Sequence, residues 1–259
     1  MQYRVKAHNT ATASTNKIHD DSVARRLGFR GGLVPGVDVY AYLCHLPAER
    51  WGKAWLERGT ITARFESPVY DGDEVGISGE PGGDEELTLT LSDPSGARCA
   101  VARASLPAQP SSTPSPADWP SMAPPAEPPP ASAETLTGAT FGSIVTTFVA
   151  DRAEEYLDDI RDTLPLFREE RLAHPGWLLR KANSVLMANV VMGPWIHVES
   201  SVQLLGAVVD GDHIETRAIV TGVSERGGHR FVDLDVLQLV ADRPVARTAH
   251  TAIYQPRGT

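Results

Sequence analysis

Two long apolar runs along the chain predict two buried helices. The first run spans 36–46 and has hardly any polar position, whereas the second spans 177–191 and has a polar edge formed by Arg180, Lys181 and Asn183. A helix that is apolar almost all the way round is enclosed on every side and does not simply rest on a surface. We therefore expect other elements to wrap each of these helices.

Strand-like alternation of apolar and polar residues accompanies both helices. Residues 3–7 alternate as a short strand before the first helix. The later strand-like runs are 59–70, 74–79, 87–92 and 97–105 after the first helix, and 195–205, 212–223, 230–239 and 246–254 after the second. The pattern predicts an α+β fold in which a curved antiparallel sheet cradles one long helix, and it predicts this arrangement twice.

The second half of the chain repeats the first in the same order, at an offset of roughly 140 residues. The matching pairs are Leu-Val-Pro-Gly at 33–36 with Ala-His-Pro-Gly at 173–176, Pro-Val-Tyr-Asp-Gly-Asp at 68–73 with Ala-Val-Val-Asp-Gly-Asp at 207–212, and Val-Ala-Arg at 101–103 with the same three residues at 245–247. Similarity at a fixed period marks a repeated structural unit. We expect two tandem domains of one fold.

A proline-rich segment separates the two halves. Residues 107–134 are dominated by Pro, Ser and Ala, and such a segment has polyproline character and cannot supply the hydrogen bonds of a central strand. The sequence therefore predicts an N-terminal domain at 1–106, a linker at 107–134 and a C-terminal domain at 135–259.

Composition and charge argue against nucleic acid, a membrane and a metal ion as partners. The formal net charge of −9 argues against nucleic acid, because phosphate binding needs a basic surface. No run of about 18 apolar residues predicts a membrane span, and Cys44 and Cys99 lack the spacing of a disulfide framework or a metal site. We expect a cytoplasmic protein with neither a metal site nor a membrane partner.

A motif in the N-terminal half carries the chemistry. The segment 14–21 reads Ser-Thr-Asn-Lys-Ile-His-Asp-Asp and is followed by Ala24, by Gly-Phe at 28–29 and by Val-Pro-Gly at 34–36. It resembles the signature of the MaoC-like, (R)-specific enoyl-thioester hydratases, which reads Asp-x-Asn-Pro-Ile-His-x-Asp, then Ala, Gly-Phe, and a small apolar residue with His-Gly opening the helix. The resemblance implies a double hotdog, in which each hotdog domain is a long helix wrapped by a curved sheet.

The resemblance also implies catalytic residues. In the family an aspartate and a histidine act on the water that adds to a 2-enoyl thioester, and an asparagine supports them. His19 and Asn16 match, Ser14 stands in the place of the aspartate, and Pro35 replaces the helix-opening histidine. Gly36 is expected to stabilise the thioester oxyanion through its backbone N–H at the helix start. Because a serine hydroxyl is not a general base at neutral pH, the second proton-transfer group would have to be Asp20, Asp21, Asp38 or a water held by Ser14.

The start of the first long helix and the segment before it are expected to contact the substrate. Candidate substrate-binding residues are Val34, Asp38, Tyr40 and Arg30. Arg30, with Arg25 and Arg26, either receives phosphates of coenzyme A or of a carrier arm or belongs to a solvated basic face. The expected ligand is an acyl thioester, with coenzyme A or an acyl carrier as part of the substrate and no separate cofactor. A fused pair of domains is compatible with a monomer or a homodimer.

Three functions stay open on this evidence. The first is reversible hydration of a 2-enoyl thioester to a 3-hydroxyacyl thioester, with His19 as the acid and base. The second is a protein that binds an acyl thioester or another small molecule without catalysis, which the exchange at Ser14 favours. The third is a thioesterase on the same fold, for which Asp38 is the candidate carboxylate.

The second half carries a complementary remnant of the motif. Asp162 and Pro165 match the aspartate and proline of the signature, but Leu164 and Phe167 stand where asparagine and histidine belong. The pseudo-twofold relation of a double hotdog is expected to place Asp162 in the other half-site, away from His19.

Overall fold

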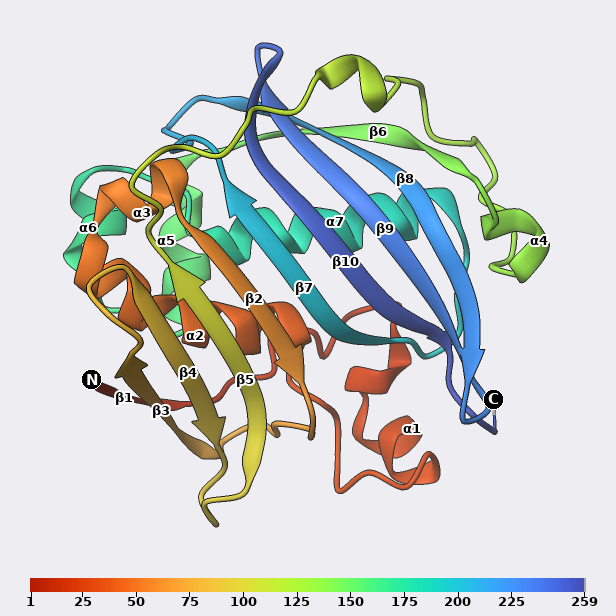
Figure 1. Cartoon of the computed structure of the whole chain (residues 1–259). Coiled ribbons are helices and arrows are strands. Elements are labelled where there is room, and N and C mark those ends of the chain that lie inside the picture. The colour runs from red at the N-terminus through yellow and green to blue at the C-terminus, as the bar shows by residue number, and fades with distance from the viewer. Residues whose placement is uncertain (259) are drawn as a thin grey trace.

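The computed structural model describes residues 1–258 and contains one ten-stranded antiparallel sheet that curves over two long helices (Figure 1). The N-terminal half supplies β1 (Gln2–Lys6), β2 (Thr60–Phe65), β3 (Glu74–Pro81), β4 (Glu86–Ser92) and β5 (Arg98–Ser105). The C-terminal half supplies β6 (Thr140–Thr147), β7 (Ile196–Leu204), β8 (His213–Arg226), β9 (His229–Val240) and β10 (Arg243–Gln255). The strand order is β1-β3-β4-β5-β2-β7-β10-β9-β8-β6, so each half mirrors the other about the central β2–β7 pair. The predicted α+β double hotdog is confirmed.

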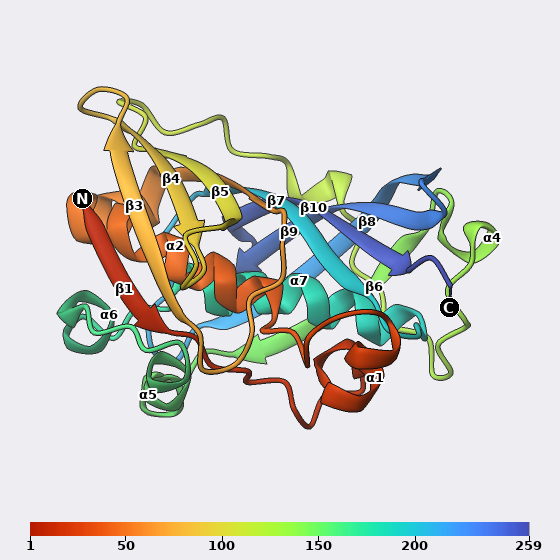
Figure 2. The ribbon, with the colours of Figure 1, turned by 90° about the horizontal axis from the view of Figure 1, so that it is seen from below.

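The two long helices are α2 (Gly36–Trp51) and α7 (Pro175–Asn189), which lie under the same face of the sheet and contact each other (Figure 2). Shorter elements connect them to the strands. These are α1 (Asp21–Arg26), α3 (Lys53–Arg58), α4 (Ala133–Leu136), α5 (Ala150–Asp159), α6 (Pro165–Glu169) and two 3-10 turns, η1 (Lys17–His19) and η2 (Pro116–Asp118).

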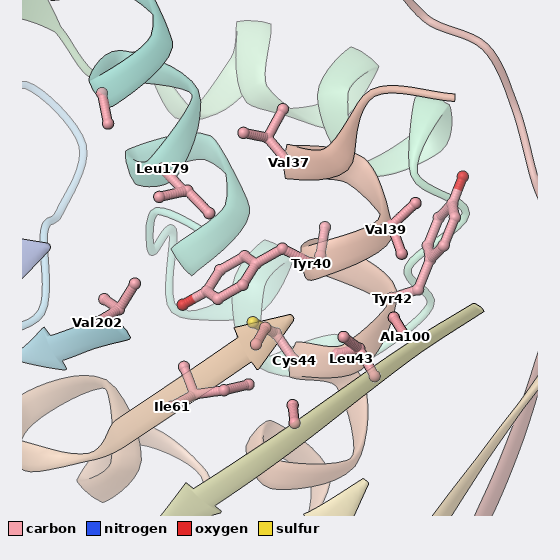
Figure 3. Close-up of a cluster of buried hydrophobic side chains, with 14 of the residues drawn as sticks. Val37, Val39, Tyr40, Tyr42, Leu43, Cys44, Ile61, Ala100, Leu179 and Val202 are labelled. Atoms are coloured by element: carbon pink, nitrogen blue, oxygen red, sulfur yellow. The ribbon is translucent and has the colours of Figure 1, made fainter. Parts of the chain in front are cut away.

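Helix α2 is enclosed on all sides, as its apolar sequence predicts. Every residue from 37 to 48 is buried, and the helix packs against the sheet above it and α7 beside it. In Figure 3 Leu43 and Cys44 lie against strand residues such as Ile61, and Tyr40 extends toward Leu179 of α7. Each large apolar side chain buried in this way contributes roughly 2 kcal/mol of transfer free energy.

The internal repeat extends to individual hydrogen bonds. Asp71 accepts the N–H of Asn9 at 2.8 Å, and Asp210 accepts the N–H of Ala150, also at 2.8 Å. The glycine after each aspartate has a positive φ, 80° and 88° respectively, a region that glycine enters without a side-chain clash. The two Asp-Gly-Asp segments therefore form the same turn in the two halves.

The proline-rich segment crosses the outer face of the C-terminal half and is attached to it (Figure 1). Trp119 is buried against Leu237 and Leu239 of β9, and its indole N–H donates to the carbonyl of Asp235 at 3.0 Å. Farther along, the carbonyl of Met122 accepts the N–H of Ser143 at 2.7 Å. The segment thus connects the halves and also covers part of the sheet.

One buried ion pair joins the two long helices. Asp38 of α2 is fully buried, and its Oδ1 accepts from Nε and Nη2 of Arg180 on α7 at 3.0 and 2.7 Å. Its Oδ2 accepts from the hydroxyl of Thr10 at 2.6 Å. Both carboxylate oxygens therefore have donors, which a buried charge requires.

Arg180→Met is expected to lower the free energy of unfolding by about 3 kcal/mol, because it leaves the Asp38 carboxylate buried without its partner. Urea unfolding at pH 7 measures the loss. The matched control is Arg30→Met, which removes the exposed Arg30–Asp73 pair and is expected to cost less than about 1 kcal/mol. Equal losses in the two variants would contradict this role for the buried pair.

Candidate active site

A cavity of about 210 Å³ lies where the two halves meet, at the start of α2. Its walls are mostly apolar, which suits the acyl part of a ligand, and a few polar groups converge on it. The N-terminal half contributes Asn16, Ile18, His19, Val34, Gly36 and Phe65, and the C-terminal half contributes Asn183, Trp195 and His197.

His19 presents one unprotonated ring nitrogen at this cavity. Its Nδ1 lies 2.7 Å from the carbonyl of Leu33, and because a carbonyl only accepts, Nδ1 carries the proton of the neutral ring. Nε2 is then the acceptor, with Nδ2 of Asn16 at 3.4 Å. Burial lowers the pKa of His19 below its ordinary value of 6.5, although the contact with Leu33 acts the other way. A neutral imidazole whose lone pair accepts only this long contact can still take a proton.

Asn16 connects the motif to the other half of the protein. Its side-chain amide donates to the carbonyl of Trp195 at 3.0 Å and accepts the N–H of the same residue at 3.1 Å. Its Oδ1 also accepts from the N–H of Ile18 at 3.4 Å, which caps η1. Asn16 therefore holds the segment that carries His19 against the start of β7.

The backbone around His19 is fixed by packing. Ile18, Ala24 and Leu33 form a small buried cluster that anchors the motif. Gly32 passes so close that an added Cβ would overlap the carbonyl of His19, so only glycine fits there. These contacts orient the imidazole without using its Nε2.

The N-terminus of α2 supplies an unused donor beside the cavity. Pro35 occupies the N-cap position, so no side chain caps the start of the helix. Among residues 1–258 the N–H of Gly36 has no hydrogen-bond partner. The first N–H groups of a helix attract negative charge. The N–H of Gly36 is therefore a free hydrogen-bond donor for a negatively polarised atom of a ligand.

The structure brings some of the predicted site residues together and separates others. His19, Asn16, Gly36 and Val34 all line the cavity. Ser14 does not line it, and its hydroxyl accepts the N–H of Asn16 at 3.1 Å. Ser14 thus shapes the loop, a common role for serine, and leaves the cavity without the aspartate of the family signature.

Three residues predicted to bind substrate do not line the cavity. Asp38 is committed to Arg180, and Tyr40 is fully buried in the core. Arg30 is on the surface, where its guanidinium contacts Asp73 at 2.6 Å and lies over the ring of Tyr70. The structure gives these three side chains packing and ion-pair contacts within the protein.

A buried chain of two histidines and one serine adjoins the cavity and is not visible in the sequence. His197 Nε2 lies 2.8 Å from the hydroxyl of Ser200, which lies 3.0 Å from Nδ1 of His250. In a regular strand, residues 197 and 200 would face opposite sides. A register shift at Thr251–Ala252 leaves Val198 as an extra residue of β7, so both side chains point inward.

His197 and His250, the two histidines hydrogen-bonded to Ser200, are held neutral. Burial and the neighbouring His250 lower the pKa of His197 well below its ordinary value, and burial lowers the pKa of His250 to about 4. His197 Nδ1 and the side-chain oxygen of Asn183 are buried beside the cavity and have no hydrogen-bond partner among the described residues. The hydrogen-bonding capacity of both atoms is therefore not used within the described part of the protein.

A second polar cluster occupies the equivalent position in the other half. Asp162 is buried, and two histidines contact its carboxylate. Nδ1 of His45 lies 3.3 Å from one carboxylate oxygen, and Nε2 of His174 lies 3.4 Å from the other. Both distances are within the range of an ion pair, but neither contact has the geometry of a hydrogen bond. His174 caps α7 by accepting the N–H of Gly176 at 3.0 Å. The ring of Tyr3 stacks on His45 with 3.6 Å between ring centres.

This cluster keeps Asp162 ionised. Burial opposes its charge, but the contacts with His174 and His45 and the N–H of Leu164 at 2.8 Å outweigh burial and lower the pKa of the carboxyl group. Phe167, which replaces the histidine of the motif, packs on His174 with ring centres 4.5 Å apart. The second half-site is therefore filled by side chains of the protein itself.

Residues 1–258 contain neither a candidate metal site nor a candidate membrane-spanning helix. The described side chains include no group of three or more His, Cys, Asp or Glu that is arranged to hold a metal ion. In the same part of the chain, no helix combines the length and the apolar character needed to cross a membrane.

Solved structures share this fold, whereas no protein-family model and no curated protein sequence matches the chain. A MaoC domain protein from Chloroflexus aurantiacus, described as a dehydratase, is 11% identical with a TM-score of 0.62 over 100% of this chain and 95% of that chain. A double-hotdog protein from Mycobacterium tuberculosis is 16% identical, with a TM-score of 0.61, and the match covers 98% of this chain and 95% of that chain. A protein from Novosphingobium aromaticivorans that is described as a thioesterase is 13% identical, with a TM-score of 0.55, and the match covers 98% of this chain and 96% of that chain.

These similarities concern the fold. They confirm that the chain is a double hotdog and that it resembles MaoC-like dehydratases in structure. Thioesterases share the same fold, so the reaction has to be argued from the residues of the cavity.

The stability of the protein is expected to fall by about 3 kcal/mol between pH 7 and pH 4 because of His250. The unfolded chain takes up this proton near pH 6.5, whereas the folded protein takes it up near pH 4, so acid favours unfolding across that interval. In His250→Asn, whose amide can still contact Ser200, the plot of unfolding free energy against pH should be flatter by this amount. The exposed His213→Asn serves as control, and a His250→Asn profile parallel to the wild-type profile would contradict the assignment.

Proposed function

We propose that the protein is a MaoC-like acyl-thioester hydratase, which adds water reversibly to a 2-enoyl thioester and forms a 3-hydroxyacyl thioester. The observation that carries this proposal is the position of His19, which has an unprotonated Nε2 and lines the same apolar cavity as Gly36, whose N–H is free. In this proposal His19 does both proton transfers, taking the proton from water and delivering it to C2, and the N–H of Gly36 stabilises the enolate oxygen.

The proposed reaction begins when Nε2 of His19 takes a proton from water. The water oxygen bonds to C3 of the enoyl group, and the electrons of the C2–C3 double bond move onto the thioester oxygen. The N–H of Gly36 stabilises this enolate. His19 then returns the proton to C2, so that the hydrogen and hydroxyl of one water are added in total. Dehydration is the same sequence in reverse.

Asn16 positions His19 in this scheme. Its amide spans from the backbone of Trp195 to the neighbourhood of the His19 ring, which fixes the distance between the base and the C-terminal wall of the cavity. The apolar walls exclude bulk water and strengthen the interaction of the enolate with the helix start. The chemistry needs no cofactor besides the coenzyme A or carrier group of the substrate.

A thioesterase is the second candidate, because a protein of the same fold carries that description. The carboxylate considered for it, Asp38, is occupied by Arg180 and Thr10 and does not line the cavity. Glu66 lines the cavity, but its carboxylate accepts from Nε of Arg98 at 2.6 Å. The positions of these carboxylates favour hydration over thioester hydrolysis.

Wild-type protein is expected to hydrate short or medium trans-2-enoyl-CoA substrates, and His19→Ala is expected to lower kcat/KM by about 100-fold or more. Loss of the enoyl absorbance measures hydration, and a thiol reagent in parallel reactions measures release of coenzyme A. The matched control is His213→Ala, which removes an exposed histidine outside the cavity.

Each other outcome identifies an alternative. Release of coenzyme A without loss of the enoyl group would indicate a thioesterase. If the wild type binds the enoyl thioester without turnover while Ser14→Asp gains activity, the protein is a binding protein with a lapsed site. Turnover that His19→Ala leaves unchanged would contradict the role of His19.

The value of kcat/KM is expected to fall at acid pH because protonation of His19 inactivates the enzyme. His19 acts as a base only when it is neutral, and burial lowers its pKa below the ordinary value of 6.5. We therefore expect kcat/KM to stay level as pH falls from 8 to about 6.5 and to decline only at lower pH. A decline that begins above pH 7 would show that another group is the base.

A further inference from the structure

His197 lies directly against the start of α2. A Cβ added to Gly36 would come within 2.9 Å of Nδ1 of His197, and the imidazole is 6% exposed and lines the cavity. Phe65 packs edge-on against the same ring, with 4.7 Å between centres. The ring is therefore held in place, and its Nδ1 edge adjoins the first turn of the helix.

Two polar groups at this point lack partners within the described chain. Nδ1 of His197 has no hydrogen-bond partner there, and neither has the N–H of Gly36. A buried polar atom without a partner costs about 1–3 kcal/mol, so such atoms need an explanation. Nδ1 of His197 is such an atom, and the free N–H of Gly36 lies next to it at the same cavity, so one ligand atom placed between them would contact both.

The hydrogen bonds of Ser200 and His250 determine whether Nδ1 of His197 is a donor or an acceptor. The single hydroxyl proton of Ser200 can point to only one of the two histidines. When it points to Nε2 of His197, His250 donates its own Nδ1 proton to the Ser200 oxygen, and the neutral His197 ring carries its proton on Nδ1. In this arrangement the cavity receives a hydrogen-bond donor.

We propose that His197 Nδ1–H and Gly36 N–H together bind the thioester carbonyl oxygen of the substrate. His197 then completes an oxyanion site built from both halves of the protein. A carbonyl oxygen only accepts hydrogen bonds, so its binding selects the arrangement in which Nδ1 carries the proton. This inference rests on the proposed function for its ligand, an acyl thioester, but does not require that the ligand is turned over.

The surroundings of His197 suit a donor that keeps its proton. A neutral imidazole N–H is a weak acid, so it stabilises an enolate oxygen through a hydrogen bond without protonating it. Burial lowers the pKa values of His197 and His250 and thereby keeps both rings neutral at physiological pH. His19 remains the residue that exchanges protons with water and with C2.

The test uses a chromophoric ligand, 4-dimethylaminocinnamoyl-CoA, an enoyl thioester whose absorption moves to longer wavelength when its carbonyl group is polarised. Wild-type protein is expected to bind this probe and shift its absorption band. His19→Ala should keep the shift but lose turnover of ordinary enoyl-CoA substrates, because His19 does not contact the carbonyl oxygen in the proposed complex.

Two substitutions at His197 separate the proposed role from a structural one. Asparagine places an amide near the position of Nδ1, whereas glutamine places it near Nε2 and keeps a contact to Ser200. His197→Asn should retain most of the band shift. His197→Gln should fold but lose the shift, and it should lower kcat by about 100-fold with a smaller effect on KM.

The outcomes distinguish this inference from the proposed function. A band shift without turnover in the wild type would reject the hydratase and support the oxyanion site. Binding without a band shift, or an equal shift in His197→Gln, would overturn the role of His197. Failure of the wild type to bind any enoyl thioester would reject both proposals, and a thermal melt of each variant verifies its fold.

Discussion

The antiparallel pairing of β2 with β7 is the interaction on which the rest of the molecule depends. It runs from Thr60 opposite Gln203 to Arg64 opposite Glu199 and joins two five-stranded sheets into one. The same pairing brings α2 and α7 together under the sheet, where the buried charge of Asp38 meets Arg180. The cavity exists only because the two halves are held in this relation.

Both halves are needed to make one site. The N-terminal half provides the motif loop and the start of α2, and the C-terminal half provides β7 with Trp195 and His197. Asn16 connects them through two hydrogen bonds to the backbone of Trp195. These hydrogen bonds fix the position of the segment that carries His19 relative to the C-terminal half, which supports a site assembled across the pseudo-twofold axis.

The two half-sites have lost complementary parts of the motif. One retains histidine and asparagine around an open cavity, and the other retains a carboxylate, Asp162, that two histidines contact beneath packed aromatic rings. An ionised carboxylate so deeply buried would be unstable without these partners. The second half-site thus stabilises the fold, and the first retains space for a ligand.

The sequence by itself determined the fold and half of the site. The first helical run has hardly any polar position and required enclosure, and the repeat required two copies. The spacing of Asn16, His19 and Gly36 placed these three residues at one cavity. Only the tertiary structure decided that Asp38 and Tyr40 face the interior, since an enclosed helix has no side that sequence alone marks as the ligand side. It also decided the place of His197. The extra residue Val198 in β7 reverses the alternation along the strand, and such a bulge depends on pairing with β10, a strand distant in sequence.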